Sequence, residues 1–241
     1  MLAGQLRAGG PVRCVCALPN GGFATGSMDN VVRVHRPGQW EQPALLSGHQ
    51  QRAGVDGVLA VAPDRGDLVS AGRDGQILFW RDGVQWQQWG ALSGHGEGVE
   101  GTNVHVVSCL GRRSDGALLS GGWDKTVRAW EGDQQVALLQ GHTIAVNAVI
   151  GLPSGEVVSG SGDQTIGVWR GAEKLRSCSA GAPVRTLCSC GGSIFASAGN
   201  DGSVRLWDAA TARQLAECKA ATAYVLSLAF HAGAAELAAG A

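Results

Sequence analysis

An aspartate recurs along this chain in one local setting, after an apolar stretch and a small residue and before a second apolar stretch. The five positions are Asp29, Asp74, Asp124, Asp163 and Asp201. A valine stands seventeen positions before three of them, at Val12, Val146 and Val184. Val225 begins a further unit in the same register, so we expect a repeat array that is cut inside its sixth unit. A period of roughly 40–45 residues is typical of a four-stranded propeller blade.

The repeat period indicates one array of β units rather than two globular domains. Each unit consists of short apolar stretches separated by Gly, Pro, Asn or Asp turns, without a helical apolar period. The 38 glycines fit many tight hairpins, because glycine tolerates positive φ. We therefore predict an all-β propeller with five four-stranded blades and a truncated sixth. The expected blades cover residues 1–46, 47–92, 93–139, 140–178, 179–219 and, in part, 220–241.

Charge and cysteine content argue against several kinds of partner. A net charge of −1 with only three lysines provides no basic face for nucleic acid. The seven cysteines form no Cys-x-x-Cys pair, so we interpret them as small buried side chains in a reducing compartment and expect no metal and no cofactor. We find neither a signal-peptide pattern nor a bilayer-spanning stretch. We expect a cytoplasmic and nuclear protein without membrane contact.

Two further elements recur with the aspartates. A Gly-His dipeptide precedes three of them, at Gly48-His49, Gly94-His95 and Gly141-His142. A tryptophan follows four of them by six positions, at Trp80, Trp130, Trp169 and Trp207. This pattern resembles the WD40 repeat over essentially the whole chain. Unit one departs from it with His35 at the tryptophan position, and the longer His-to-Asp spacings in units two and three predict loop insertions there.

The resemblance implies a hydrogen-bonded chain of His, Ser, Asp and Trp in three blades. The implied tetrads are His49, Ser70, Asp74 and Trp80; His95, Ser120, Asp124 and Trp130; and His142, Ser159, Asp163 and Trp169. Such a chain is chemically sensible, because Trp and Ser donate, imidazole relays and a carboxylate accepts several bonds. When every member of a buried network has a partner, the network specifies one arrangement of its strands.

Three copies of Ser, His and Asp also raise the alternative of hydrolase triads. A hydrolase needs one exposed nucleophile and an oxyanion hole, whereas these copies follow a structural period. The sequence contains no Gly-x-Ser-x-Gly elbow, no His-Glu-x-x-His motif and no P-loop. We therefore expect a scaffold rather than an enzyme, with no catalytic residues.

Finer details resemble the phospholipase A-2-activating protein family. The match is carried by Leu118–Trp130, Leu138–Val149 and Ser159–Trp169, with Trp123 directly before the turn aspartate. The family has a seven-bladed propeller, so the resemblance implies that this chain is an incomplete ring. It also implies a non-catalytic adaptor that binds ubiquitin or ubiquitinated proteins in ubiquitin-dependent degradation. An AAA+ segregase would bind only through family domains that this chain lacks. The alternative is a generic WD40 interaction scaffold, in ribosome assembly or a ubiquitin ligase.

In WD40 propellers, residues beside the turn aspartates and in the Gly-His loops lie on the upper face, where partners bind. The resemblance therefore implies a set of partner-binding candidates. These candidates are Met28, Arg73, Trp123, Thr143 and Asn200. An exposed Trp or Arg is a favoured interface anchor. The simpler readings are that Trp123 packs over the central channel and that Arg73 is a solvated loop residue.

Overall fold

The computed structural model describes residues 8–50, 57–96, 104–231, 233 and 236–240. Every regular element in these ranges is a β-strand. The described residues include no helix long and apolar enough to cross a membrane. The chain divides into two compact units, residues 1–108 and 109–241, which we describe separately. The loop insertions expected in the second and third repeats fall at residues 51–56 and 97–103, outside the described residues.

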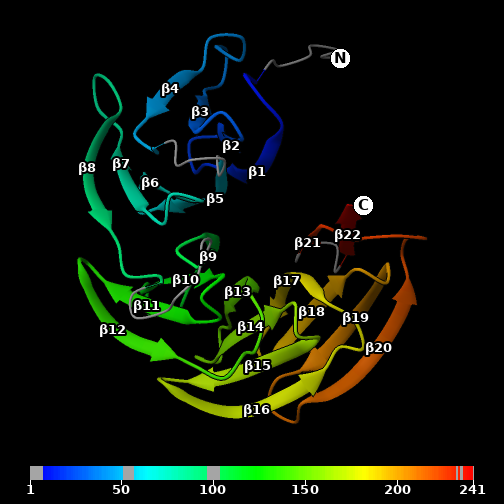
Figure 1. Cartoon of the computed structure of the whole chain (residues 1–241). Coiled ribbons are helices and arrows are strands. Elements are labelled where there is room, and N and C mark those ends of the chain that lie inside the picture. The colour runs from blue at the N-terminus through cyan, green and yellow to red at the C-terminus, as the bar shows by residue number, and fades with distance from the viewer. Residues whose placement is uncertain (1–7, 51–56, 97–103, 232, 234–235, 241) are drawn as a thin grey trace. The chain divides into compact units, whose positions relative to one another are not determined.

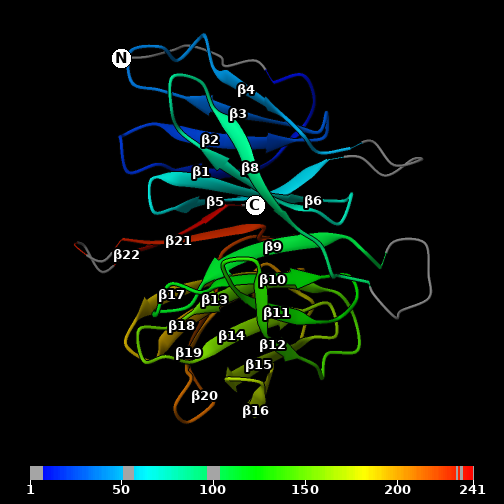
Figure 2. The ribbon, with the colours of Figure 1, turned by 90° about the vertical axis from the view of Figure 1, so that its left-hand side faces the viewer.

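The first unit contains two four-stranded antiparallel sheets, each with its strands in chain order (Figure 1). The sheet of blade one consists of β1 (Val12–Ala17), β2 (Phe23–Ser27), β3 (Val31–His35) and β4 (Ala44–Ser47). The sheet of blade two consists of β5 (Val58–Asp64), β6 (Asp67–Gly72), β7 (Ile77–Arg81) and β8 (Gln87–Leu92). The two sheets lie face to face, with β5 against β1 and β2 (Figure 2).

The second unit starts within β9 and contains three four-stranded sheets and one two-stranded sheet. Blade three consists of β9 (Val107–Arg112), β10 (Leu118–Gly122), β11 (Val127–Glu131) and β12 (Gln134–Leu139). Blade four consists of β13 (Val146–Gly151), β14 (Val157–Ser161), β15 (Thr165–Arg170) and β16 (Glu173–Ser179). Blade five consists of β17 (Val184–Gly191), β18 (Ile194–Gly199), β19 (Ser203–Asp208) and β20 (Arg213–Lys219). Two further strands, β21 (Ser227–His231) and β22 (Glu236–Gly240), form the last sheet. The predicted five four-stranded sheets and shorter sixth are confirmed.

The recurring aspartate shapes the hairpin between the second and third strands of every four-stranded sheet. Its carboxylate accepts the backbone N–H two residues later, at 2.9–3.1 Å in all five blades. The intervening residue has a φ between 64° and 81°; these residues are Asn30, Gly75, Lys125, Gln164 and Gly202. This is a three-residue hairpin loop in which a type I turn is followed by a left-handed residue. The aspartate period of the sequence is therefore a turn period.

Neighbouring sheets within a unit pack through a glycine in the second strand of one blade and a valine that begins the next. A Cβ built on Gly160 would lie 2.4 Å from Val184 Cγ1, which is far closer than packed atoms approach. The same contact joins Gly121 to Val146. The buried cluster between blades four and five continues outward from it through Leu187, Phe195 and Trp207. The absence of a side chain at these glycines sets how closely the sheets approach.

Candidate functional site

A hydrogen-bonded chain of four side chains runs through blade four. The Trp169 Nε1–H donates to Ser159 Oγ at 2.8 Å, and Ser159 Oγ lies 2.8 Å from His142 Nε2. On the other side of the imidazole, His142 Nδ1 lies 3.0 Å from a carboxylate oxygen of Asp163. Ser159, His142 and Trp169 are buried. The chain thereby links β14, β15, the turn between them and the loop that precedes β13.

The donors in this chain determine the protonation state of His142. Because Ser159 Oγ accepts from Trp169, its own O–H is available to donate to Nε2 of the imidazole. In that arrangement His142 is neutral and carries its proton on Nδ1, from which it donates to Asp163. Burial lowers the pKa of His142 below its ordinary value and outweighs the opposing effect of the Asp163 carboxylate. The hydrogen-bond pattern and the lowered pKa agree.

Asp163 collects donors from both loops at this edge of blade four. It accepts from the Thr143 backbone N–H at 2.9 Å and from the Thr165 N–H and Oγ1–H at 2.9 and 2.6 Å. Burial by itself raises the pKa of Asp163, but the bonds from Thr165, Thr143 and His142 outweigh it, so the pKa lies below its ordinary value. One carboxylate therefore holds the β14–β15 turn against the loop that enters β13.

The Ser159, His142 and Asp163 distances match those of a hydrolase triad, but the setting does not. The Ser159 hydroxyl is fully buried, and its oxygen already accepts the Trp169 N–H. A nucleophilic serine has to reach the carbon of a bound carbonyl group beside an oxyanion hole. The arrangement in blade four instead places the hydroxyl inside the sheet, where it connects strands.

Blade two repeats this geometry. Trp80 Nε1–H donates to Ser70 Oγ at 2.7 Å, His49 Nε2 lies 2.7 Å from the same oxygen, and His49 Nδ1 lies 3.0 Å from Asp74. Burial by itself raises the pKa of Asp74. Bonds from His49 and from the backbone N–H groups of Gln50 and Gln76 outweigh burial and lower the pKa below its ordinary value. The tetrads implied for blades two and four are thus both brought together.

Blade three combines parts of this arrangement with an arginine beside the aspartate. Trp130 Nε1–H donates to Ser120 Oγ at 2.9 Å. Asp124 accepts from Thr126 and also lies 3.6 Å from the guanidinium of Arg128. His95 is buried, and its carbonyl oxygen accepts from the ring of His105 at 3.2 Å.

Blades one and five, which lack Gly-His, use arginine at the aspartate. Asp29 pairs with Arg33 at 2.6 Å, and Asp201 pairs with Arg205 at the same distance. The bond from Arg33 is the largest cause that lowers the pKa of Asp29, to about 2. The tetrad reasoning missed these partners, although an arginine four residues after the aspartate was visible in the sequence.

The partner-binding candidates in the first unit lie beside hairpin turns and are half-buried. The Met28 backbone N–H donates to the Pro11 carbonyl at 3.0 Å. The Arg73 backbone N–H donates to the Gly57 carbonyl, also at 3.0 Å. Both positions are thus anchored through their backbones to the loop that enters the first strand of a sheet.

The candidates in the second unit differ in exposure. Trp123 and Asn200 are half-buried, whereas Thr143 is exposed. The side-chain oxygen of Asn200 accepts from Arg185 Nε at 2.7 Å. Sequence reasoning missed Ile144, the residue after Thr143, whose side chain is 51% exposed. The only sequence signal for Ile144 is its place in the Gly-His loop.

Metal binding has no support in the described part of the chain, where no three His, Cys, Asp or Glu side chains gather in a ligand-like group. The paired cysteines are also poor ligands. Burial is the largest cause that raises the thiol pKa of Cys14 to about 12 and of Cys16 to about 11. A metal ligand would have to be the thiolate, which burial disfavours here.

Comparison with known proteins relates this geometry to other chains. Over 93% of its length the chain is 27% identical to the ribosome biogenesis protein WDR12 homolog of Chlamydomonas reinhardtii. Over 64% of its length it is 30% identical to the phospholipase A-2-activating protein of Xenopus laevis. It spans 60% and 19%, respectively, of the lengths of these two relatives.

The fold is also that of a solved structure, the WD40 beta propeller domain of Doa1. The TM-score is 0.82 at 24% identity, and the match covers 97% of this chain and 77% of the other. The family model for the WD domain, G-beta repeat, matches most of this chain. The matched residues are 2–36, 40–81, 86–131, 133–170 and 173–208. The chain therefore belongs to the WD40, or G-beta, repeat family, and its fold is the all-β WD40 propeller.

Proposed function

We propose that this WD40 scaffold is a non-catalytic adaptor that binds ubiquitin through loops beside its turn aspartates. The sequence resemblance to the phospholipase A-2-activating protein family supports the choice of ubiquitin. The observation that carries the proposal is the exposed, well-anchored loop of blade four that contains Thr143 and Ile144.

This loop is tied down on both sides of the exposed isoleucine. The Ile144 carbonyl accepts from Ser161 Oγ at 2.9 Å, and the next carbonyl, of Ala145, accepts from the Gly162 N–H at 3.0 Å. The Thr143 N–H donates to Asp163. An apolar side chain on a fixed backbone loses little conformational freedom on binding, which favours association. Ile144 would serve as the apolar anchor and Thr143 as its polar neighbour, with Trp123 as a further candidate.

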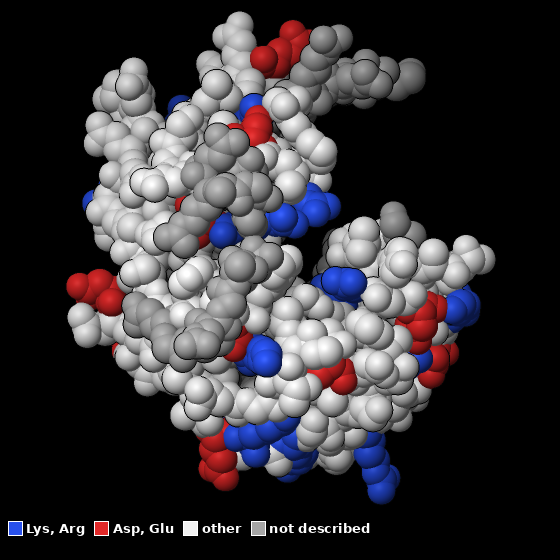
Figure 3. Space-filling model, viewed as in Figure 1, with Lys and Arg blue, Asp and Glu red and all other residues white. Residues whose placement is uncertain are grey.

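Two other observations favour protein binding over catalysis or nucleic-acid binding. The hydroxyls of Ser70, Ser120 and Ser159 are each occupied by a tryptophan N–H inside a sheet. Positive and negative side chains are interspersed over the face seen in Figure 3, and the net charge is −1. Nucleic acid generally requires a basic face.

The test is a titration of isotope-labelled ubiquitin with the full chain, followed by NMR. Ile144→Ala should weaken binding several-fold, because it removes the apolar anchor and leaves the tether of blade four intact. Val136→Ala is the matched control, since Val136 is similarly exposed at 45% but lies on β12. No shift of ubiquitin signals at millimolar wild-type chain would refute the proposal. Equal binding by both variants would show that another residue is the anchor.

A second candidate function is scaffolding in ribosome assembly. It is favoured by the similarity to the ribosome biogenesis relative, which extends over 93% of this chain against 64% for the phospholipase A-2-activating protein. A tagged chain would then co-sediment with particles that contain precursor ribosomal RNA. Sedimentation only in the soluble fractions would argue against this candidate and leave the ubiquitin proposal untouched.

A further inference from the structure

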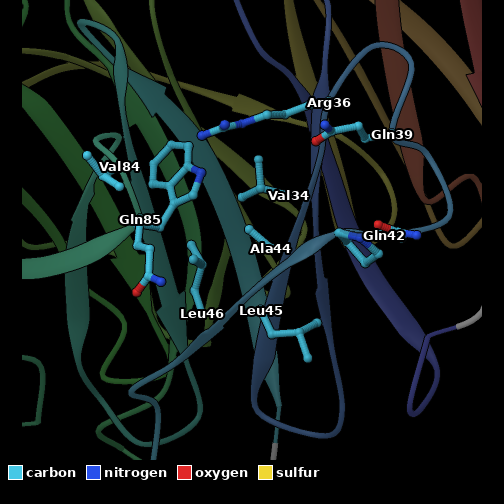
Figure 4. A pocket seen from close by; sticks show the side chains of 11 residues that line it. Val34, Arg36, Gln39, Gln42, Ala44, Leu45, Leu46, Val84 and Gln85 are labelled. Carbon is cyan, nitrogen blue, oxygen red and sulfur yellow. The ribbon is translucent and has the colours of Figure 1, made fainter.

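A pocket of about 350 Å³ lies within the first unit, between the outer part of blade one and the connection from β7 to β8 of blade two (Figure 4). Blade one contributes β4 and the chain that leads into it, which includes Gln39 and Gln42. Blade two contributes Gln85 and Trp86. The β3–β4 connection lies at the opposite end of the sheet from the β2–β3 turn that holds Met28. Within the first unit, the pocket is therefore separate from the turn that bears Met28.

The base of the pocket is apolar and contains an unsatisfied donor. Val34 and Leu46 are buried in the core shared by blades one and two, and the Trp86 ring packs against the same core. The Trp86 Nε1–H is shielded from solvent and meets no acceptor among the described residues. A buried N–H without a partner costs free energy that a ligand oxygen can recover.

The walls carry neutral amides. The side chains of Gln39, Gln42 and Gln85 make no hydrogen bond with any part of the chain that the structure describes. Each primary amide offers both donors and an acceptor, the same complement that a peptide backbone presents. Three such side chains around one hollow suit a ligand that is rich in amide groups.

Charge and strand exposure further define the ligand. Arg36 and Asp82 form an ion pair between the two blades, so the one charged residue that lines the pocket is already neutralised. β4 pairs with β3 along one side only and is an edge strand of its sheet. Leu45, on that edge strand, is 61% exposed. An open strand edge can accept an extended peptide as an additional strand.

We propose that this pocket binds an extended, uncharged peptide segment of a partner protein. One aliphatic side chain of the segment lies against Val34 and Leu46. Its backbone amides exchange hydrogen bonds with the glutamines, and one carbonyl accepts the Trp86 N–H. The volume is at the lower end for ligand pockets, which fits one or two peptide residues rather than a folded domain. The exposed Leu45 and the neutral lining favour a peptide over a charged or strongly polar ligand.

The experiment selects binders from a displayed library of random heptapeptides with the full chain as bait, and then measures affinities of the selected peptides. Uncharged sequences with a central aliphatic residue should be enriched. The double variant Gln42→Ala/Gln85→Ala should weaken their binding about tenfold, since each neutral hydrogen bond contributes modestly. Trp86→Phe should weaken it by a smaller factor because it keeps an aromatic ring and removes the N–H.

Gln87→Ala is the matched control, because Gln87 is an exposed glutamine on β8 outside the pocket lining. It should leave affinity within about twofold. Melting curves of all variants separate lost binding from lost folding. Enrichment of charged peptides, or equal binding by the glutamine double variant and the Gln87 control, would overturn the proposal. Binding of a neutral oligosaccharide that competes at Gln42 and Gln85, without peptide binding, would also overturn it.

Discussion

Blades four and five have the same strand order, but different side chains stabilise the turn between the second and third strands of each blade. In blade four the turn aspartate meets a buried neutral histidine and two backbone amides. In blade five Asp201 meets Arg205, which also lies 3.0 Å from Glu217. Both blades keep the bond from tryptophan to serine at 2.8 Å. The comparison shows that the histidine is dispensable for building a blade, whereas the aspartate turn is common to both.

The two fastenings also differ in what they connect. His142 reaches from the loop before β13 into the sheet, so the blade-four network spans two loops and two strands. Arg205 connects its own hairpin to Glu217 on β20, and both side chains of this pair are partly exposed. The blade-four network therefore reaches the loop that bears Thr143 and Ile144, whereas the Arg205 pairs join β19, β20 and the turn before β19.

The largest effect should come from removing the aspartate of blade four. Asp163→Ala leaves the donors of His142, Thr143 and Thr165 without their acceptor, so the free energy of unfolding should fall by about 2–3 kcal/mol. Asp201→Ala should cost only about 1 kcal/mol, because Arg205 keeps Glu217 and water can replace the lost bonds. Urea unfolding followed by tryptophan fluorescence measures both. Equal losses would show that the two fastenings are equivalent.

An intermediate effect should appear on mild acidification. Because the pKa of His142 lies below its ordinary value, the unfolded chain binds a proton near pH 6 that folded blade four does not. The stability from this group is therefore present above about pH 6.5 and declines as the pH falls below it. Asp201 also has a lowered pKa, so its contribution is lost only in stronger acid, below its ordinary value near 3.8.

Hydrogen exchange resolved by segment measures this difference. Between pH 7.5 and 5.5, amides of β13 and β14 should lose protection worth at most about 1.4 kcal/mol after correction for intrinsic rates. Amides of β18 and β19 should change little. His142→Gln should abolish the response of blade four. A uniform loss across both blades would contradict the assignment to His142.

The smallest effect should come from exchanging the left-handed residue of the turn. Gln164 has a φ of 68°, and the matching residue of blade five is Gly202, with a φ of 70°. Gln164→Gly should raise the free energy of unfolding by about 0.5 kcal/mol, since relief of the left-handed strain exceeds the added freedom of the unfolded chain. Gln164→Ala should bring no gain. Thermal unfolding compares the two, and stabilisation by alanine would contradict the backbone explanation.

The architecture could be predicted from the sequence because one residue type, aspartate, marks the same hairpin turn in every four-stranded sheet. Each aspartate fixes a hairpin turn because its carboxylate accepts the backbone N–H two residues later, so its period survives even where histidine or tryptophan is replaced. Blade one illustrates this: buried His35 stacks on Phe23 in place of a tryptophan, with ring centroids 4.5 Å apart, and the hairpin is unchanged. Local turn chemistry can be read from spacing.

The candidate binding surface was less predictable because exposure depends on how loops pack. Thr143 and Ile144 are both exposed, but nothing in their spacing distinguishes them from half-buried Trp123 or Asn200. The pocket around Gln42 and Gln85 is assembled from two blades and leaves no periodic signal. The arginine partners of Asp29 and Asp201 each stand four residues after the aspartate, but the WD40 tetrad predicts a histidine as the partner of the aspartate.

The contact between Gly160 and Val184 has a consequence for how such arrays grow. Each repeat carries the valine of this contact at the start of its first strand and the small residue of the contact in its second strand. A segment duplicated in whole multiples of the repeat therefore contains both the valine and the small residue. The contacts at the new junctions between blades then match the existing ones. Blade five has a small residue, Ala198, at the position that corresponds to Gly160. Ala198 lies in a buried cluster with Val225. Lengthening by gene duplication requires no compensating change at the junctions, whereas a single enlarged residue there would disturb the contact between two neighbouring units.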